Sequence, residues 1–324
     1  MRNRDAPVEI GEGQFDLKRT ADLEDRFGCC GKKHCGPQAY LTTLLHLTTG
    51  LPWAARIGRA DSDERGHLRR LLRFLPPDAL LVADAGFVGY PLWQHLIQRH
   101  VRFLIRVGAN VNLLTELGWE VRTYAGVVCL WPAYARQRGQ APLVLRLIRV
   151  RDGRNREMCL VTNVLEAGEL SVDQAVKAYR LRWGIELWFR QMKQTAARRQ
   201  LASAAPCAAT LELAWLVVAL ALQGMLGVHE AVRRGHDPLR LSPAALLQVW
   251  RALAGQPGLR GGRRTLRRRL GPCLKDGYQR KAPKVRKPWP AKKRDHPPGV
   301  PKITVATAAQ VAAAPQLKAA QSLL

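Results

Sequence analysis

Residues 179–193 read YRLRWGIELWFRQMK and place one carboxylate, Glu186, among cationic and aromatic side chains. On an α-helix with about 100° per residue, Tyr179, Arg182, Glu186 and Lys193 fall within an arc of about 60°. Alternating acids and bases stabilise a surface helix by a few tenths of a kcal/mol per pair, but this stripe holds a single acid. The stripe suits a phosphodiester better, because Arg forks onto phosphate oxygens, Lys adds a point charge and Glu can hold a divalent metal.

A second candidate acid follows an apolar run. Residues 79–87 read ALLVADAGF, which is typical of a strand buried on both faces. An acid at the end of such a strand is costly unless it is paired or metal-bound, and α/β proteins place their sites at strand ends. Asp84 is therefore a candidate metal ligand. The alternative is that Asp84 caps the next helix.

The remaining pattern predicts alternating strands and helices. We expect a β-hairpin around Thr49-Gly50, a β-rich insertion at about 111–164, and a helix from Ser171 to about Arg199. The other predicted elements are a helix over 63–75, a helix over 91–100, a strand over 102–108 and an apolar helix over 208–229. We expect the apolar helix to be buried in a soluble domain rather than to cross a membrane.

The charge of the chain indicates a polyanionic partner. The 324 residues include 52 Lys and Arg against 25 Asp and Glu, a formal net charge of +27. Nucleic acid is the first expectation and an anionic membrane surface the second. Residues 260–294 hold 15 Lys and Arg and one acid, Asp276, so we expect them to stay disordered until they meet phosphate. The alternative is a solvated tail without a partner.

The seven cysteines do not indicate a disulfide framework, because their number is odd and no secretory leader pattern opens the chain. A reducing cytoplasm is the expected compartment. The densest group is Cys29, Cys30, His34 and Cys35, which lacks a second ligand pair at a useful distance. We therefore expect a loop with free thiols rather than a zinc site.

The stripe also resembles a known signature. Tyr179, Arg182, Glu186 and Lys193 are spaced like the Tyr-(2)-Arg-(3)-Glu-(6)-Lys motif of DDE-type bacterial insertion-sequence transposases of the IS-four group. Residues 83–90, ADAGFVGY, resemble the second-Asp motif of the same family. The resemblance covers about residues 11–230.

The resemblance implies an α/β fold, namely a ribonuclease-H-like mixed sheet with flanking helices and a β-rich insertion, followed by a basic disordered C-terminal tail. The implied division is a catalytic domain over 1–230, with its insertion at about 111–164, and a basic, low-complexity tail over 231–324.

The resemblance also implies metal-dependent phosphodiester hydrolysis and strand transfer at transposon ends, with Mg²⁺ or Mn²⁺ as cofactor. By carry-over, Asp84 and Glu186 are catalytic metal ligands, and Tyr179, Arg182 and Lys193 bind DNA phosphates. The implied partner is double-stranded DNA, both transposon ends and target, bound by a homodimer. We expect no membrane partner and a place in the bacterial cytoplasm at the nucleoid.

One position departs from the family pattern. Residues 9–28 read EIGEGQFDLKRTADLEDRFG, and the first Asp of the family aligns with Gly11. Glu12 and Asp16 are the candidate substitutes for this acid. We therefore expect impaired cleavage, and a truncated start, because the family usually carries a helical end-binding region before its core. The alternatives are a catalytically inactive DNA-binding remnant and an RNA-associated basic protein.

Overall fold

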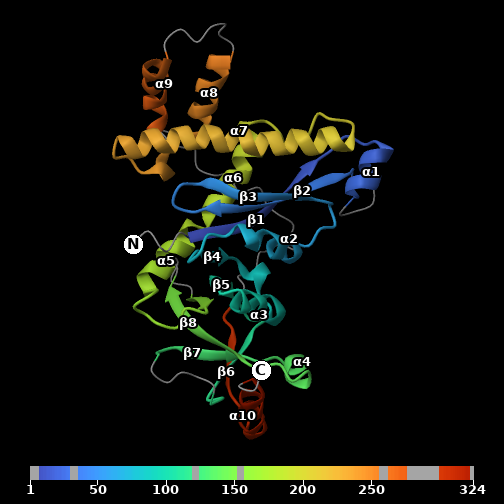
Figure 1. Ribbon diagram of the computed structural model, residues 1–324, viewed down its shortest axis with the longest axis vertical. Coiled ribbons are helices and arrows are strands. Elements are labelled where there is room, and N and C mark those ends of the chain that lie inside the picture. Colours follow the sequence, from blue (N-terminus) through green and yellow to red (C-terminus); the bar gives the residue numbers. More distant parts are fainter. Residues whose placement is uncertain are drawn as a thin grey trace, which may run out of the picture. The chain divides into compact units, whose positions relative to one another are not determined.

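The computed structural model describes residues 7–29, 36–118, 124–151, 157–254, 262–275 and 299–321. The chain divides into two compact units. Unit 1 comprises residues 1–5, 77–180 and 286–324, and unit 2 comprises residues 6–76 and 181–285. Figure 1 labels most elements of both units, numbered in chain order.

Unit 2 begins with three antiparallel strands, β1 (Pro7–Asp16), β2 (Gln38–His46) and β3 (Leu51–Gly58). The turn between β2 and β3 contains Gly50 at a φ of 68°, a conformation that glycine adopts without steric cost. The predicted hairpin is thus confirmed. Helices α1 (Ala21–Phe27) and α2 (Glu64–Leu71) accompany these strands, and α2 confirms the helix predicted over 63–75.

The second half of unit 2 is helical. Helix α6 (Trp183–Arg190) leads into a π-helical turn (Gln191–Thr195), and α7 (Pro206–Arg233) follows. Their apolar side chains share one core with those of β1, β2 and α1. Its members include Phe15, Phe27, Leu41, Trp188, Phe189, Met192 and Leu213.

The sequence predicted one continuous helix from Ser171 to about Arg199, and this prediction is wrong. Helix α5 (Val172–Leu181) ends before α6 begins, and the last part of the stretch is the π turn. A π turn bonds residue i to i+5 and so shifts every later side chain around the axis. The phase computed for Lys193 from an ideal helix therefore does not hold.

Unit 1 is a mixed sheet with helices. Its strand order is β10-β6-β7-β8-β9-β5-β4. The bounds are β4 (Leu80–Ala83), β5 (Arg102–Val107), β6 (Asn112–Thr115), β7 (Val127–Leu130), β8 (Leu143–Arg151), β9 (Glu157–Thr162) and β10 (Lys302–Val305). The β4–β5 and β10–β6 pairs are parallel, and the other pairs of this unit are antiparallel. The expected mixed α/β class and the strands predicted between 111 and 164 are confirmed.

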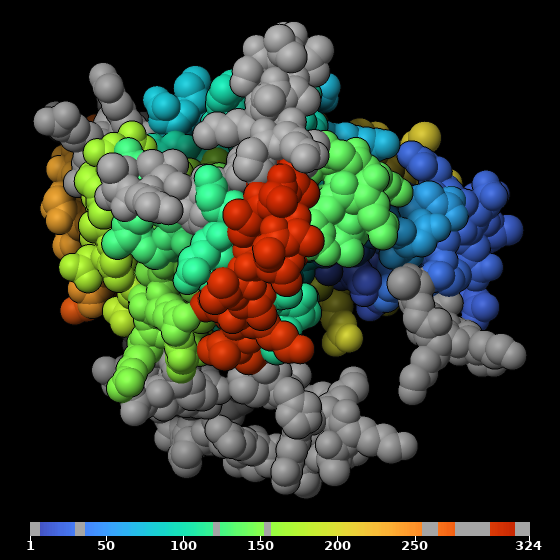
Figure 2. All heavy atoms as spheres, turned by 90° about the horizontal axis from the view of Figure 1, so that it is seen from below, coloured from blue at the N-terminus to red at the C-terminus, as the bar shows by residue number. Residues whose placement is uncertain are grey.

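The helices of unit 1 are α3 (Tyr90–Gln98), α4 (Ala133–Gln137), α5 and α10 (Ala308–Gln321). Helix α10, red in Figure 2, lies at the surface of this unit. Strand β10 precedes it and pairs with β6. The sequence did not indicate that its low-complexity end would add a strand to the sheet, because pairing with β6 is a long-range contact.

Helix α7 differs from the buried helix that the sequence predicted. Its inner face is buried through Ala209, Leu213 and Leu220, but only 22% of its most apolar 18-residue window is buried. The 28-residue helix, with a mean hydropathy of 1.9 in that window, is long and apolar enough to cross a membrane. Its outer face exposes large apolar side chains: Leu211, Trp215, Val218, Leu222, Met225 and Val232.

The expected disordered tail is wrong for much of the segment after residue 231. Helices α8 (Pro243–Ala254) and α9 (Gly262–Leu270) lie there and are labelled in Figure 1. They share a small apolar cluster that includes Leu246, Leu270 and Cys273. A leucine every few residues is enough to bury one stripe of a basic helix, and the net charge of a segment does not reveal this. Residues 276–298 lie outside the described part of the chain.

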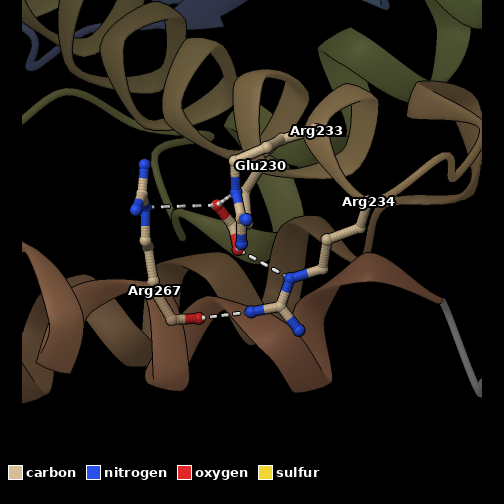
Figure 3. Close-up of polar contacts among 4 residues, drawn as sticks. All are labelled: Glu230, Arg233, Arg234 and Arg267. Atoms are coloured by element: carbon tan, nitrogen blue, oxygen red, sulfur yellow. Dashed lines mark hydrogen bonds and ion pairs between the residues drawn. The ribbon is translucent and has the colours of Figure 1, made fainter.

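A buried carboxylate ties α7 to α9 (Figure 3). Glu230 is 1% exposed and accepts hydrogen bonds from Arg233 Nη2 and Arg234 Nε, both at 2.6 Å. Arg267 Nε of α9 lies 3.8 Å from Glu230 Oε2, and Arg234 Nη2 donates to the Arg267 carbonyl at 3.0 Å. The hydrogen bond from Arg233, opposed by burial and reinforced by Arg234, lowers the pKa of Glu230 to about 2.

We predict that Glu230→Gln lowers the free energy of unfolding by about 2 kcal/mol at pH 7, because three guanidinium groups lose their shared anion. A carboxyl with a lowered folded pKa contributes stability above its ordinary pKa of 4.5 and loses it as the pH falls toward 2. The difference between the two proteins should therefore be constant from pH 5 to 7 and shrink below about pH 4.5.

Urea unfolding across this pH range measures the difference. Glu24→Gln is the matched control, since Glu24 forms an exposed pair with Arg19 and should change stability by less than about 1 kcal/mol. A Glu230→Gln difference that stays the same from pH 7 to pH 3 would contradict the assigned role.

Candidate functional site

Helix α6 packs very closely against one face of β1. A β-carbon added at Gly11 would lie 2.6 Å from Cγ1 of Ile185, and one added at Gly13 would lie 2.5 Å from Cδ1 of Phe189. Side chains alternate between the two faces of a strand, so these glycines lie on the same face. They leave room for the buried Ile185 and Phe189 side chains of α6.

Glu9 lies on the same face, two residues before Gly11, and is 1% exposed. Its Oε2 accepts the backbone N–H of Ile185 at 3.3 Å, and its Oε1 lies 3.7 Å from Arg182 Nη1. An anion is favourable at the first turn of a helix, where backbone N–H groups point outward. Sequence reasoning missed Glu9, although its two-residue offset from Gly11 places it on the face that the first Asp was expected to occupy.

Arg182 also reaches the predicted metal ligand. Its Nη2 lies 3.7 Å from Glu186 Oε1, one helical turn further along. The Arg182 side chain is 22% exposed, whereas that of Glu186 is 45% exposed. One guanidinium group thus stands close to a buried and an exposed carboxylate. Arg182 and Glu186 therefore lie close together, as the sequence predicted.

Lys193 lies at the other end of β1. Its Nζ is 5.3 Å from the centre of the Phe15 ring, a cation–π arrangement. Burial lowers the pKa of Lys193, while the nearby charge of Asp16 opposes this shift. Arg199 lowers the pKa further and Glu12 raises it. The ammonium group of Lys193 thus has two carboxylates nearby, those of Asp16 and Glu12.

The two alternative first acids occupy different surroundings. Asp16 accepts a hydrogen bond from Gln38 Nε2 at 2.8 Å and lies 3.7 Å from Arg199 Nε. Its backbone also bonds Arg199 and Leu201, which closes the loop after the π turn onto β1. Glu12 is exposed on the face of β1 opposite Gly11. Neither acid therefore takes the position of Gly11.

Asp84 and Tyr179 belong to unit 1. Asp84 follows β4, as predicted, and its Oδ1 accepts the backbone N–H of Gly86 at 2.8 Å. It therefore caps a short 3₁₀ helix (Ala85–Phe87), whereas α3, the helix predicted after Asp84, has Gly89 at its N-cap. Tyr179, near the end of α5, is 8% exposed. Within unit 2 the structure brings together Arg182 and Glu186.

The metal ligands expected from the sequence, Asp84 and Glu186, belong to different units, so the metal site that combines them stays a prediction. Among the described residues, no group of three or more His, Cys, Asp and Glu is placed to hold a metal ion. The predicted first position is Gly11, which offers no ligand, and the Glu186 carboxylate has a guanidinium beside it. The described residues thus include Asp84 and Glu186 but no carboxylate at the first of the three expected positions. Of the cysteine group, Cys29 is an exposed free thiol, and Cys30, His34 and Cys35 lie outside the described residues.

A family model described as the transposase DDE domain matches residues 22–222, which is more than half of the chain. The chain belongs to this DDE transposase family. Family members are typically polynucleotidyl transferases that use divalent metals, and DNA transposition is the activity that the family implies. The match begins after β1, so it does not include the position of Gly11.

The similar proteins are distant. Transposase InsG for insertion sequence element IS4 of Escherichia coli (strain K12) is 26% identical over 175 residues, which are 51% of this chain and 38% of that protein. The matched segment therefore spans well under half of the length of this relative.

Two solved structures are also similar. A piggyBac transposase synaptic complex with hairpin DNA has a TM-score of 0.44 at 13% identity, covering 86% of this chain and 59% of that one. A Mos1 transposase paired-end complex with the left transposon end has a TM-score of 0.22 at 11% identity, covering 30% and 34%. The family assignment depends on the family model and not on these structures.

We predict that Gly11→Ala lowers the free energy of unfolding by about 1–3 kcal/mol, because its methyl group overpacks against the buried Ile185. Combining it with Ile185→Ala should cost less than the sum of the two single changes, since the second change removes the overlapping atoms. Urea unfolding of the four proteins gives the coupling energy.

Gly36→Ala is the matched control, because its added β-carbon would lie 4.0 Å from the nearest atom. It should leave stability within about 0.5 kcal/mol of the unmodified chain. Strict additivity of Gly11→Ala and Ile185→Ala would show that the two positions are not in contact.

Proposed function

We propose that this chain is a DNA-binding transposase whose metal-dependent cleavage of phosphodiester bonds is impaired. The expected substrates are transposon ends and target DNA. Asp84 and Glu186 are the proposed ligands for Mg²⁺ or Mn²⁺, and Tyr179, Arg182 and Lys193 are the proposed phosphate-binding residues. Family membership supports the reaction class, and the residues of β1 support the impairment.

The contact between Gly11 and Ile185 is the observation that supports impaired cleavage. An Asp side chain at Gly11 would meet Ile185 within van der Waals distance, so α6 is packed for a residue without a side chain. Two metal ions close together repel each other strongly unless a carboxylate lies between them. A chain that lacks the first carboxylate would hold the metals weakly.

DNA binding is supported by the charge and by its placement. The net charge of +27 favours nonspecific contact with phosphates. Helix α9 carries Arg267, Arg268 and Arg269 in its last turn. Because Glu230 holds Arg267 beside α7, part of the basic segment has a defined place in unit 2. This arrangement also supports the alternative function, a DNA-binding remnant without catalysis.

The test measures DNA binding and cleavage separately for four proteins: the unmodified chain, Gly11→Asp, Gly11→Asp with Ile185→Ala, and Glu186→Gln. All four should bind duplex DNA, with log K falling against log salt at a slope of about −5 to −9. With cognate ends and Mg²⁺ or Mn²⁺, the unmodified chain should cleave at background level. The double variant should gain cleavage, because it has both the carboxylate and the space for it.

Each result has a separate meaning. Efficient cleavage by the unmodified chain that disappears in Glu186→Gln would contradict the impairment and leave an active transposase. A folded double variant that binds DNA but does not cleave would favour the inactive remnant. Absence of salt-dependent DNA binding would contradict the whole proposal.

We further infer that two copies of the chain pair through the outer face of α7, which would supply the expected homodimer. Leu211, Trp215, Val218, Leu222 and Met225 recur at alternating spacings of four and three, the repeat by which two helices interlock. Exposed side chains of this size offer on the order of 100 Å² each, so pairing of the five on two copies would bury roughly 1,000 Å² in total, about the least that a specific interface buries. A second copy carries the same stripe and therefore matches it.

We predict that Leu222→Glu shifts the chain from dimer to monomer by at least tenfold in dissociation constant, since it would bury a carboxylate in an apolar seam. Analytical ultracentrifugation without DNA measures this shift. Val311→Glu is the matched control, because Val311 is an exposed apolar residue on α10. A chain that is monomeric at all concentrations, or equally dimeric in both variants, would contradict pairing through α7.

A further inference from the structure

A small cationic pocket lies within unit 2, away from the contact of β1 with α6. It has a volume of about 250 Å³ and lies among α1, the end of β3 and α2. The lining side chains that could bind a ligand include Arg26, Arg56, Arg59, Ser62, His67 and Arg70. The described residues that line this pocket include no carboxylate, and Thr210 adds a lining hydroxyl.

The guanidinium groups of the pocket are poorly compensated. The Nε atom of Arg56 is buried and has no hydrogen-bond partner among the described residues. Arg59 is the exception, because its Nε lies 3.2 Å from Asp61 and its Nη1 donates to the carbonyl of Asp25. An ion pair with Arg26, Arg56 or Arg70 is absent from the described part of the chain. A buried donor without an acceptor costs free energy that a ligand could recover.

The electrostatics of the pocket agree with a missing anion. Burial lowers the pKa of Arg56, and the charges of Arg70 and Arg73 lower it further. Burial also lowers the pKa of His67, as do Arg56 and Arg70, and Asp63 acts in the opposite direction. Like charges held together in this way repel each other, and an anion between them would relieve the repulsion.

The backbone and the imidazole ring hold this arrangement in place. The buried Thr42 hydroxyl contacts Nδ1 of His67 at 2.7 Å and so orients the ring. A β-carbon at Gly58 would lie 2.5 Å from both Cε1 of His67 and the Ser62 hydroxyl oxygen, so Gly58 lets these groups approach β3. Asp63 caps α2 by accepting the N–H groups of Arg65 and Gly66. Its carboxylate is therefore engaged with backbone donors.

We propose that this pocket binds a phosphate group. Arg56 and Arg70 supply planar, charged donors that suit phosphate oxygens, and Ser62 and Thr210 supply hydroxyl groups. The volume exceeds that of a phosphate ion and leaves space for part of a sugar. The phosphate can come from a DNA backbone or from a free phosphate or mononucleotide. The site does not depend on cleavage, so it can be tested independently of the proposed function.

Isothermal titration of the full chain with inorganic phosphate tests the site. Phosphate should bind the unmodified chain, and Arg56→Gln and Arg70→Gln should each weaken its binding at least tenfold. Arg251→Gln is the matched control, because Arg251 is an exposed arginine of α8 outside the pocket, and it should bind phosphate as the unmodified chain does.

A second readout separates loss of the site from loss of the fold. Removing the charge of Arg56 relieves its repulsion with Arg70 and Arg73, so Arg56→Gln should unfold at the same or a higher temperature without phosphate. Added phosphate should raise the unfolding temperature of the unmodified chain and not that of Arg56→Gln. Equal phosphate binding by the unmodified chain and both pocket variants, or no phosphate binding at all, would overturn the proposal.

Competition identifies the source of the phosphate. If duplex DNA displaces bound phosphate and Arg56→Gln weakens DNA binding more than Arg251→Gln does, the pocket holds a backbone phosphodiester. If a nucleoside monophosphate displaces phosphate and DNA does not, the pocket holds a small molecule. Both outcomes support phosphate recognition. A chain that binds phosphate here but lacks any affinity for DNA would contradict the proposed function while leaving this site intact.

Discussion

Unit 2 depends on the close contact between β1 and α6. Gly11 and Gly13 remove side chains from one face of the strand, and Ile185 and Phe189 fill the space. Because of this contact, Arg182 lies near the buried Glu9, and a backbone N–H in the first turn of α6 donates to the Glu9 carboxylate. A carboxylate at Gly11 is incompatible with the same packing. The glycine that gives the helix its place is therefore also the position at which the family pattern expects a metal ligand.

A second constraint is the shortage of acids in a chain with a net charge of +27. Several buried or partly buried carboxylates are shared among many donors. Glu230 interacts with Arg233, Arg234 and Arg267. Glu9 accepts the N–H of Ile185 and also lies close to the guanidinium group of Arg182. Although burial acts to raise its pKa, Glu212 keeps a lowered pKa, because the backbone N–H of Ala202 and the hydroxyl and N–H of Ser203 bond to it. Each of these acids fixes a loop or a helix end.

The same shortage leaves some cations without a protein anion. In the pocket between α1, β3 and α2, Arg56 and Arg70 lie near each other without a carboxylate on the lining. The last turn of α9 carries three consecutive arginines, of which Arg267 lies 3.8 Å from Glu230. Both places are suited to phosphate, because phosphate oxygens offer several acceptors and negative charge at once. Family membership in the DDE transposases agrees with a polyanionic partner of this kind.

The sequence by itself determined the features that depend on local pattern. Two strand-like runs flanking the Thr49-Gly50 turn predicted the β2–β3 hairpin, and the apolar run before Asp84 predicted β4, because strand preference and turn geometry act over a few residues. The spacing of Tyr179, Arg182, Glu186 and Lys193, with the motif around Asp84, indicated the family. The net charge indicated the type of partner.

Only the tertiary structure decided which of these residues meet. The π turn that contains Lys193 and the end of α5 at Leu181 interrupt the stripe that an ideal helix predicts. Packing against Ile185 decided that Gly11 has no room for a carboxylate, and it made Glu9 the buried acid of the site. The exposed face of α7 and the pairing of β10 with β6 were equally invisible in the sequence. These features depend on contacts between residues that are distant in the chain, and local periodicity does not encode the partners of such contacts.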